Sequence, residues 1–73
     1  MERVYTGTVT SFDKGWGFID YYDNNGRKKS IFVHWTNIDM DGYKNLNPGQ
    51  RVDFTIGKGK NGKDHAENVT VVD

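Results

Sequence analysis

Two short segments of this chain place ring-bearing side chains at every second position. They are Lys14-Gly15-Trp16-Gly17-Phe18-Ile19 and Ile31-Phe32-Val33-His34-Trp35. Successive side chains of a β-strand point to opposite faces of the sheet. One face would therefore carry the rings of Trp16, Phe18, Phe32 and His34. The opposite face would carry the aliphatic side chains of Ile19, Ile31 and Val33.

Only one of these two faces can form the interior of the protein. A chain of 73 residues has a single modest hydrophobic core, so it cannot bury both sides of a sheet. We expect the aliphatic face to be the core and the aromatic face to be exposed to solvent. Exposed apolar patches usually mark a binding surface, and rings flanked by Lys and Gly suit a stack of nucleobases.

The residues around the two segments favour an all-β chain, because glycine, β-branched and aromatic residues are frequent and alanine occurs once. We expect five strands, over residues 3–12, 16–22, 30–35, 51–56 and 65–72. Turns are predicted at Asn24-Asn25-Gly26, at Asn47-Pro48-Gly49-Gln50 and over residues 57–63. One helical turn is expected at 36–39, inside the longer connection 36–49.

A three-stranded meander, a long crossing and a final hairpin predict a small closed barrel, which leaves no exposed sheet edge. The whole chain, 1–73, is expected to form one domain. Its predicted interior consists of Val9, Ile19, Ile31, Val33, Val52, Phe54, Ile56 and Val69, capped by Ile38 and Leu46.

Composition argues against several other kinds of chemistry. Ten Lys and Arg balance ten Asp and Glu, which does not fit a polybasic binder of duplex DNA. The chain has no cysteine, and His34 and His65 lack the spacing of metal ligands. No candidate nucleophile has a nearby base. We expect no metal, no cofactor and no enzymatic activity.

The segment at the N-terminus lacks the apolar run of a signal peptide, and no stretch approaches the ~18 apolar residues of a membrane helix. Together with the absence of cysteine, this favours a cytoplasmic protein without membrane contact.

The chain resembles the bacterial cold-shock proteins over nearly its whole length. The matching segments are Gly7-Thr8-Val9, Phe12, Lys14-Gly15-Trp16-Gly17-Phe18-Ile19, Ile31-Phe32-Val33-His34-Trp35, Gly42-Tyr43-Lys44-Asn45-Leu46, Gly49-Gln50-Arg51-Val52-Asp53-Phe54 and Ala66-Glu67-Asn68-Val69. The two central segments correspond to the paired ribonucleoprotein-type motifs of that family. The resemblance implies a five-stranded antiparallel Greek-key barrel of the oligonucleotide-binding (OB) type.

The resemblance also implies a function and a set of contact residues. Such proteins bind single-stranded RNA and DNA, preferably pyrimidine-rich, and act as ATP-independent RNA chaperones and transcription antiterminators in stress responses. The positions that match the family's binding residues are Phe12, Lys14, Trp16, Phe18, Phe32, His34, Trp35 and Tyr43. Lys14 matches a lysine that contacts the backbone of the nucleic acid. The protein is expected to be a monomer.

Three regions of the chain depart from the family's usual pattern. Thr10-Ser11-Phe12-Asp13 stands where Lys-Trp-Phe-Asn is usual, so a lysine and a stacking tryptophan are missing. The loop before Lys14 is about two residues shorter. The loop at 22–29 is longer and carries the basic triplet Arg27-Lys28-Lys29, and the last loop is rich in lysine.

Two alternatives remain open at this point. A small barrel can use an aromatic strip to bind an extended or proline-rich peptide, which would fit the loss of the expected tryptophan. The second alternative is a homodimer formed by strand exchange or edge pairing.

Overall fold

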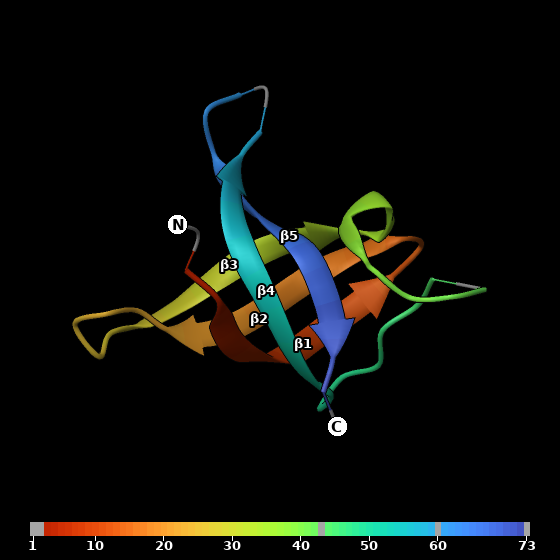
Figure 1. Ribbon diagram of the computed structural model, residues 1–73, viewed down its shortest axis with the longest axis horizontal. Helices are drawn as coiled ribbons and strands as arrows, with labels where there is room; N and C mark the ends of the chain where they lie inside the picture. The colour runs from red at the N-terminus through yellow and green to blue at the C-terminus, as the bar shows by residue number, and fades with distance from the viewer. Residues whose placement is uncertain (1–2, 43, 60, 73) are drawn as a thin grey trace.

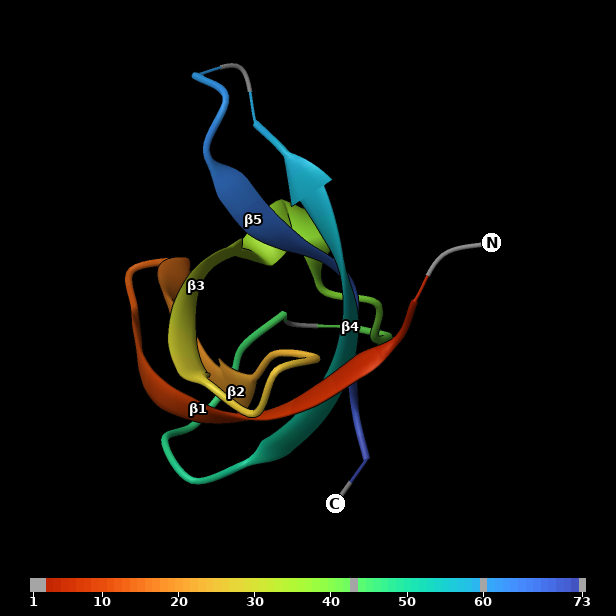
Figure 2. The same ribbon diagram turned by 90° about the vertical axis from the view of Figure 1, so that its left-hand side faces the viewer.

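The strands of this protein close into a small barrel. The computed structural model describes residues 3–42, 44–59 and 61–72, and within them five strands and one 3₁₀ turn are present. The strands are β1 (Tyr5–Asp13), β2 (Trp16–Tyr22), β3 (Lys28–His34), β4 (Arg51–Lys58) and β5 (Asp64–Val71). The 3₁₀ turn η1 (Trp35–Asn37) follows β3 directly. Around the barrel the order is β1-β2-β3-β5-β4 (Figures 1 and 2).

Four of the strand pairings around the barrel are antiparallel, and one is parallel. The pairs β1–β2, β2–β3, β1–β4 and β4–β5 run antiparallel. The barrel closes between β3 and β5, which are parallel and are in register at Phe32 and His65. The β4–β5 hairpin extends beyond the rest of the barrel, as Figures 1 and 2 show. The fold is the predicted five-stranded barrel, with a short parallel contact at its seam.

The core forms where the alternation of side chains predicts it. Of the ten predicted interior and capping residues, only Ile56 is not fully buried; it packs against the core from its rim. Two core residues were not predicted: Tyr21 and Ala66. Tyr21 lies at the end of β2, where its ring contacts Phe54 edge-on at 5.3 Å between centroids. Burial raises the pKa of the Tyr21 phenol.

Element boundaries differ from the prediction by a few residues. β3 begins at Lys28 rather than at residue 30, because Lys28 and Lys29 pair with Tyr22 and Tyr21 of β2. The helical turn begins at Trp35, one residue earlier than expected, because His34 caps it. β4 continues to Lys58, so the β4–β5 loop is shorter than predicted.

The β1–β2 connection is a two-residue turn made by Lys14 and Gly15. Asp13 pairs with Trp16, and Lys14 and Gly15 adopt φ angles of 57° and 90°. Two successive positive φ angles are the pattern of a type I′ hairpin turn, whose twist matches that of the flanking strands. The shortened loop noted in the sequence is therefore a tight hairpin.

The β2–β3 loop is organised by Asp23. Its Oδ1 accepts hydrogen bonds from the backbone N–H groups of Asn25 and Arg27, both at 2.9 Å. The hydrogen bond from Arg27 is the main reason that the pKa of the Asp23 carboxyl lies below its ordinary value. The loop spans residues 23–27 between the paired residues Tyr22 and Lys28, so it is wider than the tight turn predicted at Asn24-Asn25-Gly26.

In the part of the chain that the structure describes, no helix is long and apolar enough to cross a membrane.

Candidate nucleic-acid interface

The predicted aromatic face is present on the outer side of β2 and β3. Trp16 pairs with His34, and Phe18 pairs with Phe32, so the four rings form two rows across neighbouring strands. Ring centroids lie 6.0 Å apart for Trp16–Phe32 and for Phe18–Phe32, and 6.4 Å apart for Phe32–His34. Trp35 extends the row past the end of β3, 5.8 Å from His34. We refer to Trp16, Phe18, Phe32, His34 and Trp35 as the aromatic strip.

The strip is accessible to solvent, and the opposite face of the same strands is not. The exposed fractions are 48% for Trp16, 38% for Phe18, 37% for Phe32 and 46% for Trp35. On the inner face they are 0% for Ile19 and Val33 and 3% for Ile31. The interpretation of the alternating pattern is therefore confirmed: the aliphatic side chains form the core, and the rings remain exposed. A continuous row of exposed rings suits the stacking of successive flat ligands.

A hydrogen bond from the backbone fixes the orientation of the His34 ring. The N–H of Thr36 donates to His34 Nδ1 at 3.4 Å, and Thr36 Oγ1 lies 2.8 Å from the same nitrogen. An Nδ1 that accepts this bond carries no hydrogen, so the neutral ring has its hydrogen on Nε2. His34 therefore offers an Nε2–H donor at the surface of the strip.

The β1–β2 turn holds Trp35 in place. The N–H of Trp35 donates to the carbonyl oxygen of Gly15 at 2.8 Å. A Cβ at Gly15 would lie 2.8 Å from Cδ1 of the Trp35 indole, which is closer than real contacts allow. Because Gly15 also has a positive φ, this position requires glycine for two reasons. The indole thus lies directly against the backbone of the turn.

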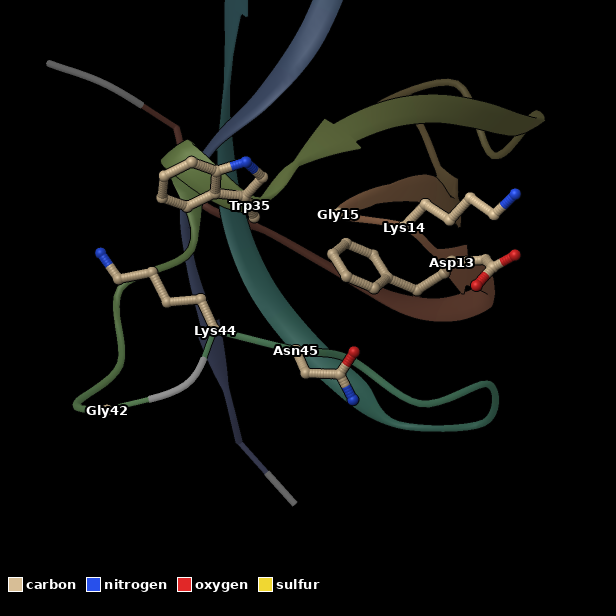
Figure 3. Close-up of a pocket in the computed structure, with 8 residues that line it drawn as sticks. Asp13, Lys14, Gly15, Trp35, Gly42, Lys44 and Asn45 are labelled. Carbon is tan, nitrogen blue, oxygen red and sulfur yellow. The ribbon is translucent and has the colours of Figure 1, made fainter.

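A pocket of about 540 Å³ opens beside this turn, at the Trp35 end of the strip (Figure 3). It is lined by Phe12, Asp13, Lys14, Gly15, Trp35, Gly42, Lys44 and Asn45. Phe12 is half-buried and packs against the core, so part of its ring supports the barrel. Lys14 is exposed, and Figure 3 shows its side chain extending away from the Trp35 indole. Tyr43, the remaining predicted contact residue, lies outside the described residues.

Ser11 lies next to the strip where the family pattern has a tryptophan. It is exposed, and it pairs with Phe18 across the β1–β2 ladder just after a bulge. A larger ring at this position would widen the strip toward β1. The serine leaves the surface beside Phe18 without that additional platform.

Three lysines of the basic clusters pair with carboxylates of the same hairpins. Lys28 lies 3.4 Å from Asp20, and Lys29 lies 3.5 Å from Asp23. In the β4–β5 hairpin, Lys58 lies 3.2 Å from Asp64. Exposed ion pairs contribute little to stability, but they reduce the positive potential available to a phosphate chain. The sequence alone did not show this pairing.

Sequence reasoning missed a second pocket, which lies on the β5 side of the strip. It has a volume of about 500 Å³ and is lined by Phe18, Phe32, Gly59, Asn61, Lys63, Asp64 and His65. The available signal was His65, which was considered only as a metal ligand. Within the described residues, no group of three or more His, Cys, Asp or Glu could hold a metal ion.

Comparison with known proteins agrees with this geometry. The model of the family described as "'Cold-shock' DNA-binding domain" matches residues 5–72. A cold shock-like protein of Aquifex aeolicus is 43% identical over 70 residues, covering 93% of this chain and 94% of that protein. Cold shock-like protein CspA of Vibrio cholerae is 44% identical over 69 residues, with 92% and 94% covered. A cold shock-like protein of Thermotoga maritima is 46% identical over 69 residues, with 92% and 97% covered.

A solved structure described as drosophila Unr CSD456 has the same fold. It superimposes with a TM-score of 0.76 at 22% sequence identity and covers 99% of this chain. The chain spans 28% of the length of that structure, so the likeness concerns one domain of it. The exposed aromatic strip, the closed barrel and these relatives lead to one conclusion: the chain belongs to the cold-shock DNA-binding domain family, whose members bind nucleic acids and are not enzymes.

Proposed function

We propose that this protein binds single-stranded RNA and DNA by stacking bases on the aromatic strip. The observation that carries the proposal is the unbroken row of rings from Phe18 to Trp35, exposed except for the half-buried His34, with centroids 5.8–6.4 Å apart. Bases of a duplex are already stacked and paired, so a row of rings engages only unpaired ones.

In the proposed complex, successive bases lie against Phe18, Phe32, Trp16 and His34, and the chain continues over Trp35. His34 donates its Nε2–H to an acceptor on a base edge. Phosphates face solvent, with Lys14 beside the Trp35 end of the path. Phe12 and Tyr43 are proposed to contribute contacts in the pocket at that end.

Binding of this kind keeps RNA strands unpaired without ATP, which supports the roles of RNA chaperone and transcription antiterminator in a cold-shock or general stress response. Pyrimidine-rich strands are the proposed ligands, because the family resemblance implies them. A monomer is sufficient for this mechanism, because one chain carries the whole strip. A cytoplasmic location remains a prediction from the sequence.

The absence of a tryptophan at Ser11 sets the expected strength of binding. Stacking of one base on one ring contributes roughly 1–3 kcal/mol. Without that platform, affinity falls by roughly 5- to 150-fold relative to a relative that has it. The enlarged rings of Trp16 and Trp35, where the family usually has phenylalanine, offset part of this loss.

The dependence of affinity on salt should be shallow. The slope of log affinity against log salt counts the phosphates neutralised by cations. Lys28, Lys29 and Lys58 are already paired with carboxylates, so few cations of the described residues remain beside the strip. Lys14, Lys44 and Lys63 line its two pockets. Stacking energy is not screened by salt, so most of the affinity persists as salt is raised.

Titration of tryptophan fluorescence with oligo-dT and oligo-U at two salt concentrations tests the proposal. We expect strong quenching, because bases cover Trp16 and Trp35, and only a mild effect of salt. A folded protein whose fluorescence does not change would contradict the proposal and favour the peptide-binding alternative. A steep dependence on salt would contradict the stacking mechanism while leaving nucleic-acid binding intact.

A further inference from the structure

The second pocket places hydrogen-bonding groups at the edge of the aromatic strip. Its apolar wall consists of Phe18 and Phe32, and its polar side comes from the start of β5 and from the β4–β5 loop. The parallel contact between Phe32 and His65 joins these two sides. A base that stacks on Phe18 or Phe32 therefore presents an edge to His65 and to the loop.

The polar side of the pocket is built around Gly59. A Cβ at this residue would lie 3.2 Å from His65 Nδ1, 3.5 Å from Asn61 Oδ1 and 3.6 Å from the carbonyl oxygen of Lys63. Because glycine has no side chain, the pocket has an open space over Gly59 on this side, in which a ligand atom can lie in van der Waals contact with the Gly59 Cα. We call this space the Gly59 cradle. Three nitrogen or oxygen atoms border it.

Two of these atoms are hydrogen-bond acceptors whose orientation the loop fixes. Asn61 Oδ1 accepts from the N–H of Lys63 at 3.0 Å, which sets the orientation of its amide. The Lys63 carbonyl accepts from the N–H of Gly59 at 2.9 Å. A carbonyl oxygen has two lone pairs, so each can accept a second hydrogen bond from a ligand.

The third atom, His65 Nδ1, is also an acceptor because of Glu67. His65 Nε2 lies 2.7 Å from Glu67 Oε2. An ionised carboxylate only accepts hydrogen bonds, so Nε2–H is the donor and the neutral ring keeps a lone pair on Nδ1. The Glu67 carboxylate reaches this place because Gly57 opposite has no side chain; a Cβ there would collide with it.

A cradle bordered by acceptors selects a ligand group that donates hydrogen bonds. An exocyclic amine carries two hydrogens on one nitrogen and can donate to two acceptors together. A keto oxygen in the same place would face three electron-rich atoms. Cytosine has an amine at the ring position where thymine and uracil have a carbonyl oxygen.

We propose that the second pocket is a cytosine subsite, in which the exocyclic amine enters the Gly59 cradle and donates to His65 Nδ1 and to a loop oxygen. The inference rests on the proposed binding of single strands, and it narrows the pyrimidine preference to cytosine at this one position. Adenine has the same amine on a larger ring, and it is included in the test as the competing source of that chemistry.

The first test uses the unaltered protein and varies the base. Short oligo-dT is compared with the same oligonucleotide carrying one cytosine, one adenine or one N4,N4-dimethylcytosine at each position in turn. At the position that occupies the pocket, cytosine should raise affinity roughly three- to tenfold over thymine. Dimethylcytosine keeps the stacking ring but has no amine hydrogen, so it should lose this gain. Equal affinity for cytosine and thymine at every position would overturn the inference, and so would a greater gain from adenine than from cytosine.

The second test fills the cradle with Gly59→Ala. Gly59 does not have a positive φ, so its backbone accepts alanine, whose methyl group would lie 3.2 Å from His65 Nδ1 and obstruct the cradle. We expect the ratio of the affinities for cytosine and thymine at this position to fall to near unity; because it is a ratio, any loss shared by both oligonucleotides cancels. Lys63→Ala is the matched control, because it truncates a side chain of the same loop and keeps the carbonyl. Lys63→Ala should change the affinities for oligo-dT and for the cytosine-containing oligonucleotide by the same factor. A cytosine gain that survives in Gly59→Ala would overturn the inference.

These measurements distinguish failure of the cytosine subsite from failure of single-strand binding. If oligo-dT binds and cytosine brings no gain, the subsite is wrong and binding of single strands stands. If no oligonucleotide binds to the folded protein, both proposals are overturned.

Discussion

The two histidines of this barrel are bonded in similar ways and present opposite chemistry. Each ring bonds to the residue two positions further along the chain: His34 to Thr36, and His65 to Glu67. Thr36 bonds to Nδ1, which leaves Nε2–H of His34 as a donor. Glu67 bonds to Nε2, which leaves Nδ1 of His65 as an acceptor. The side chain two positions away thus decides whether an imidazole gives or takes a hydrogen bond.

The surroundings of the two histidine rings also differ: one ring lies in an open row and the other lines a pocket. His34 lies between Phe32 and Trp35 in an open row of rings. His65 lines a pocket bordered by a loop, where the edge of a base meets fixed polar atoms. The comparison separates an open hydrogen-bond donor at His34, which tolerates any base with an acceptor on its edge, from an acceptor inside a pocket at His65, which favours a base with an amine. Substitutions can test each half of this separation.

The largest expected effect comes from Phe32→Ala, because Phe32 serves both regions. Its ring neighbours Trp16, Phe18 and His34, and its backbone pairs with His65. We expect affinity for any single strand to fall by roughly 5- to 150-fold. Fluorescence titration with oligo-dT measures the loss. Tyr22→Ala is the control, because Tyr22 lies at the opposite end of β2 from Trp16 and pairs with Lys28 rather than with a ring, so it should change affinity by less than about twofold. Equal losses in both variants would argue against the strip.

Glu67→Gln should remove the distinction between cytosine and thymine with little loss of oligo-dT binding. The amide of glutamine can donate to Nε2, so the ring is no longer held with Nδ1 as acceptor. The gain from cytosine, roughly three- to tenfold in the unaltered protein, should fall to near unity. Nitrogen NMR shifts of the His65 ring should report the mixed tautomers. Retained selectivity with an unchanged His65 spectrum would contradict the role of Glu67 as a positioning residue.

Thr36→Val should weaken binding at the other histidine by a smaller factor. The hydroxyl contact to Nδ1 is lost, while the backbone N–H of residue 36 still holds the ring. We expect a loss of roughly twofold in affinity for oligo-dT and no change in the cytosine gain. Thr36→Ser keeps the hydroxyl and should bind like the unaltered protein. A change in cytosine selectivity would show that the two histidines are not independent.

The smallest effect on binding is expected at Asp23. Its carboxylate accepts hydrogen bonds from the backbone two and four residues further along the chain. These bonds organise a loop that lies away from both histidine rings. The hydrogen bond from the Arg27 N–H lowers the pKa of the Asp23 carboxyl below 3.8. Stability from this bond is therefore fully present above the pKa of the unfolded chain, and it is lost as pH falls through the lower folded value. Asp23→Ala should remove this part of the acid dependence of thermal unfolding, whereas Asp23→Asn keeps an acceptor oxygen. Affinity for oligonucleotides should not change in either variant.

The sequence predicted the strip and the core because both depend on alternation along single strands. Trp16, Phe18 and Phe32 faced outward as soon as Ile19 and Val33 were assigned to the interior. Tyr21 was missed because a tyrosine at a strand end reads equally well as an exposed residue. The cold-shock resemblance supplied the Greek-key type of the barrel, which alternation alone does not determine.

The second pocket was beyond the reach of the sequence for a physical reason. It depends on the empty space at Gly57 and Gly59, and these glycines read as ordinary members of a hairpin loop. It also depends on the parallel contact between Phe32 and His65, which are far apart in the chain. The ion pairs of Lys28 and Lys29 were hidden in the same way, because cross-strand register decides which carboxylate each lysine meets.

The barrel seam connects recognition with the mechanics of the fold. Among residues 3–42, 44–59 and 61–72, β3 and β5 are in register at one position, Phe32 and His65, so we expect the barrel to open most easily at this junction. A nucleotide that stacks on Phe32 and hydrogen-bonds to His65 would contact both β3 and β5 and link the two strands at this junction. Its binding free energy is then added to the cost of parting the strands. When an oligonucleotide is bound, the hydrogen-exchange rates of amides in β3 and β5 near the seam should fall more than those of amides in β1. The ligand would thus act as a reversible cross-link between the two strands.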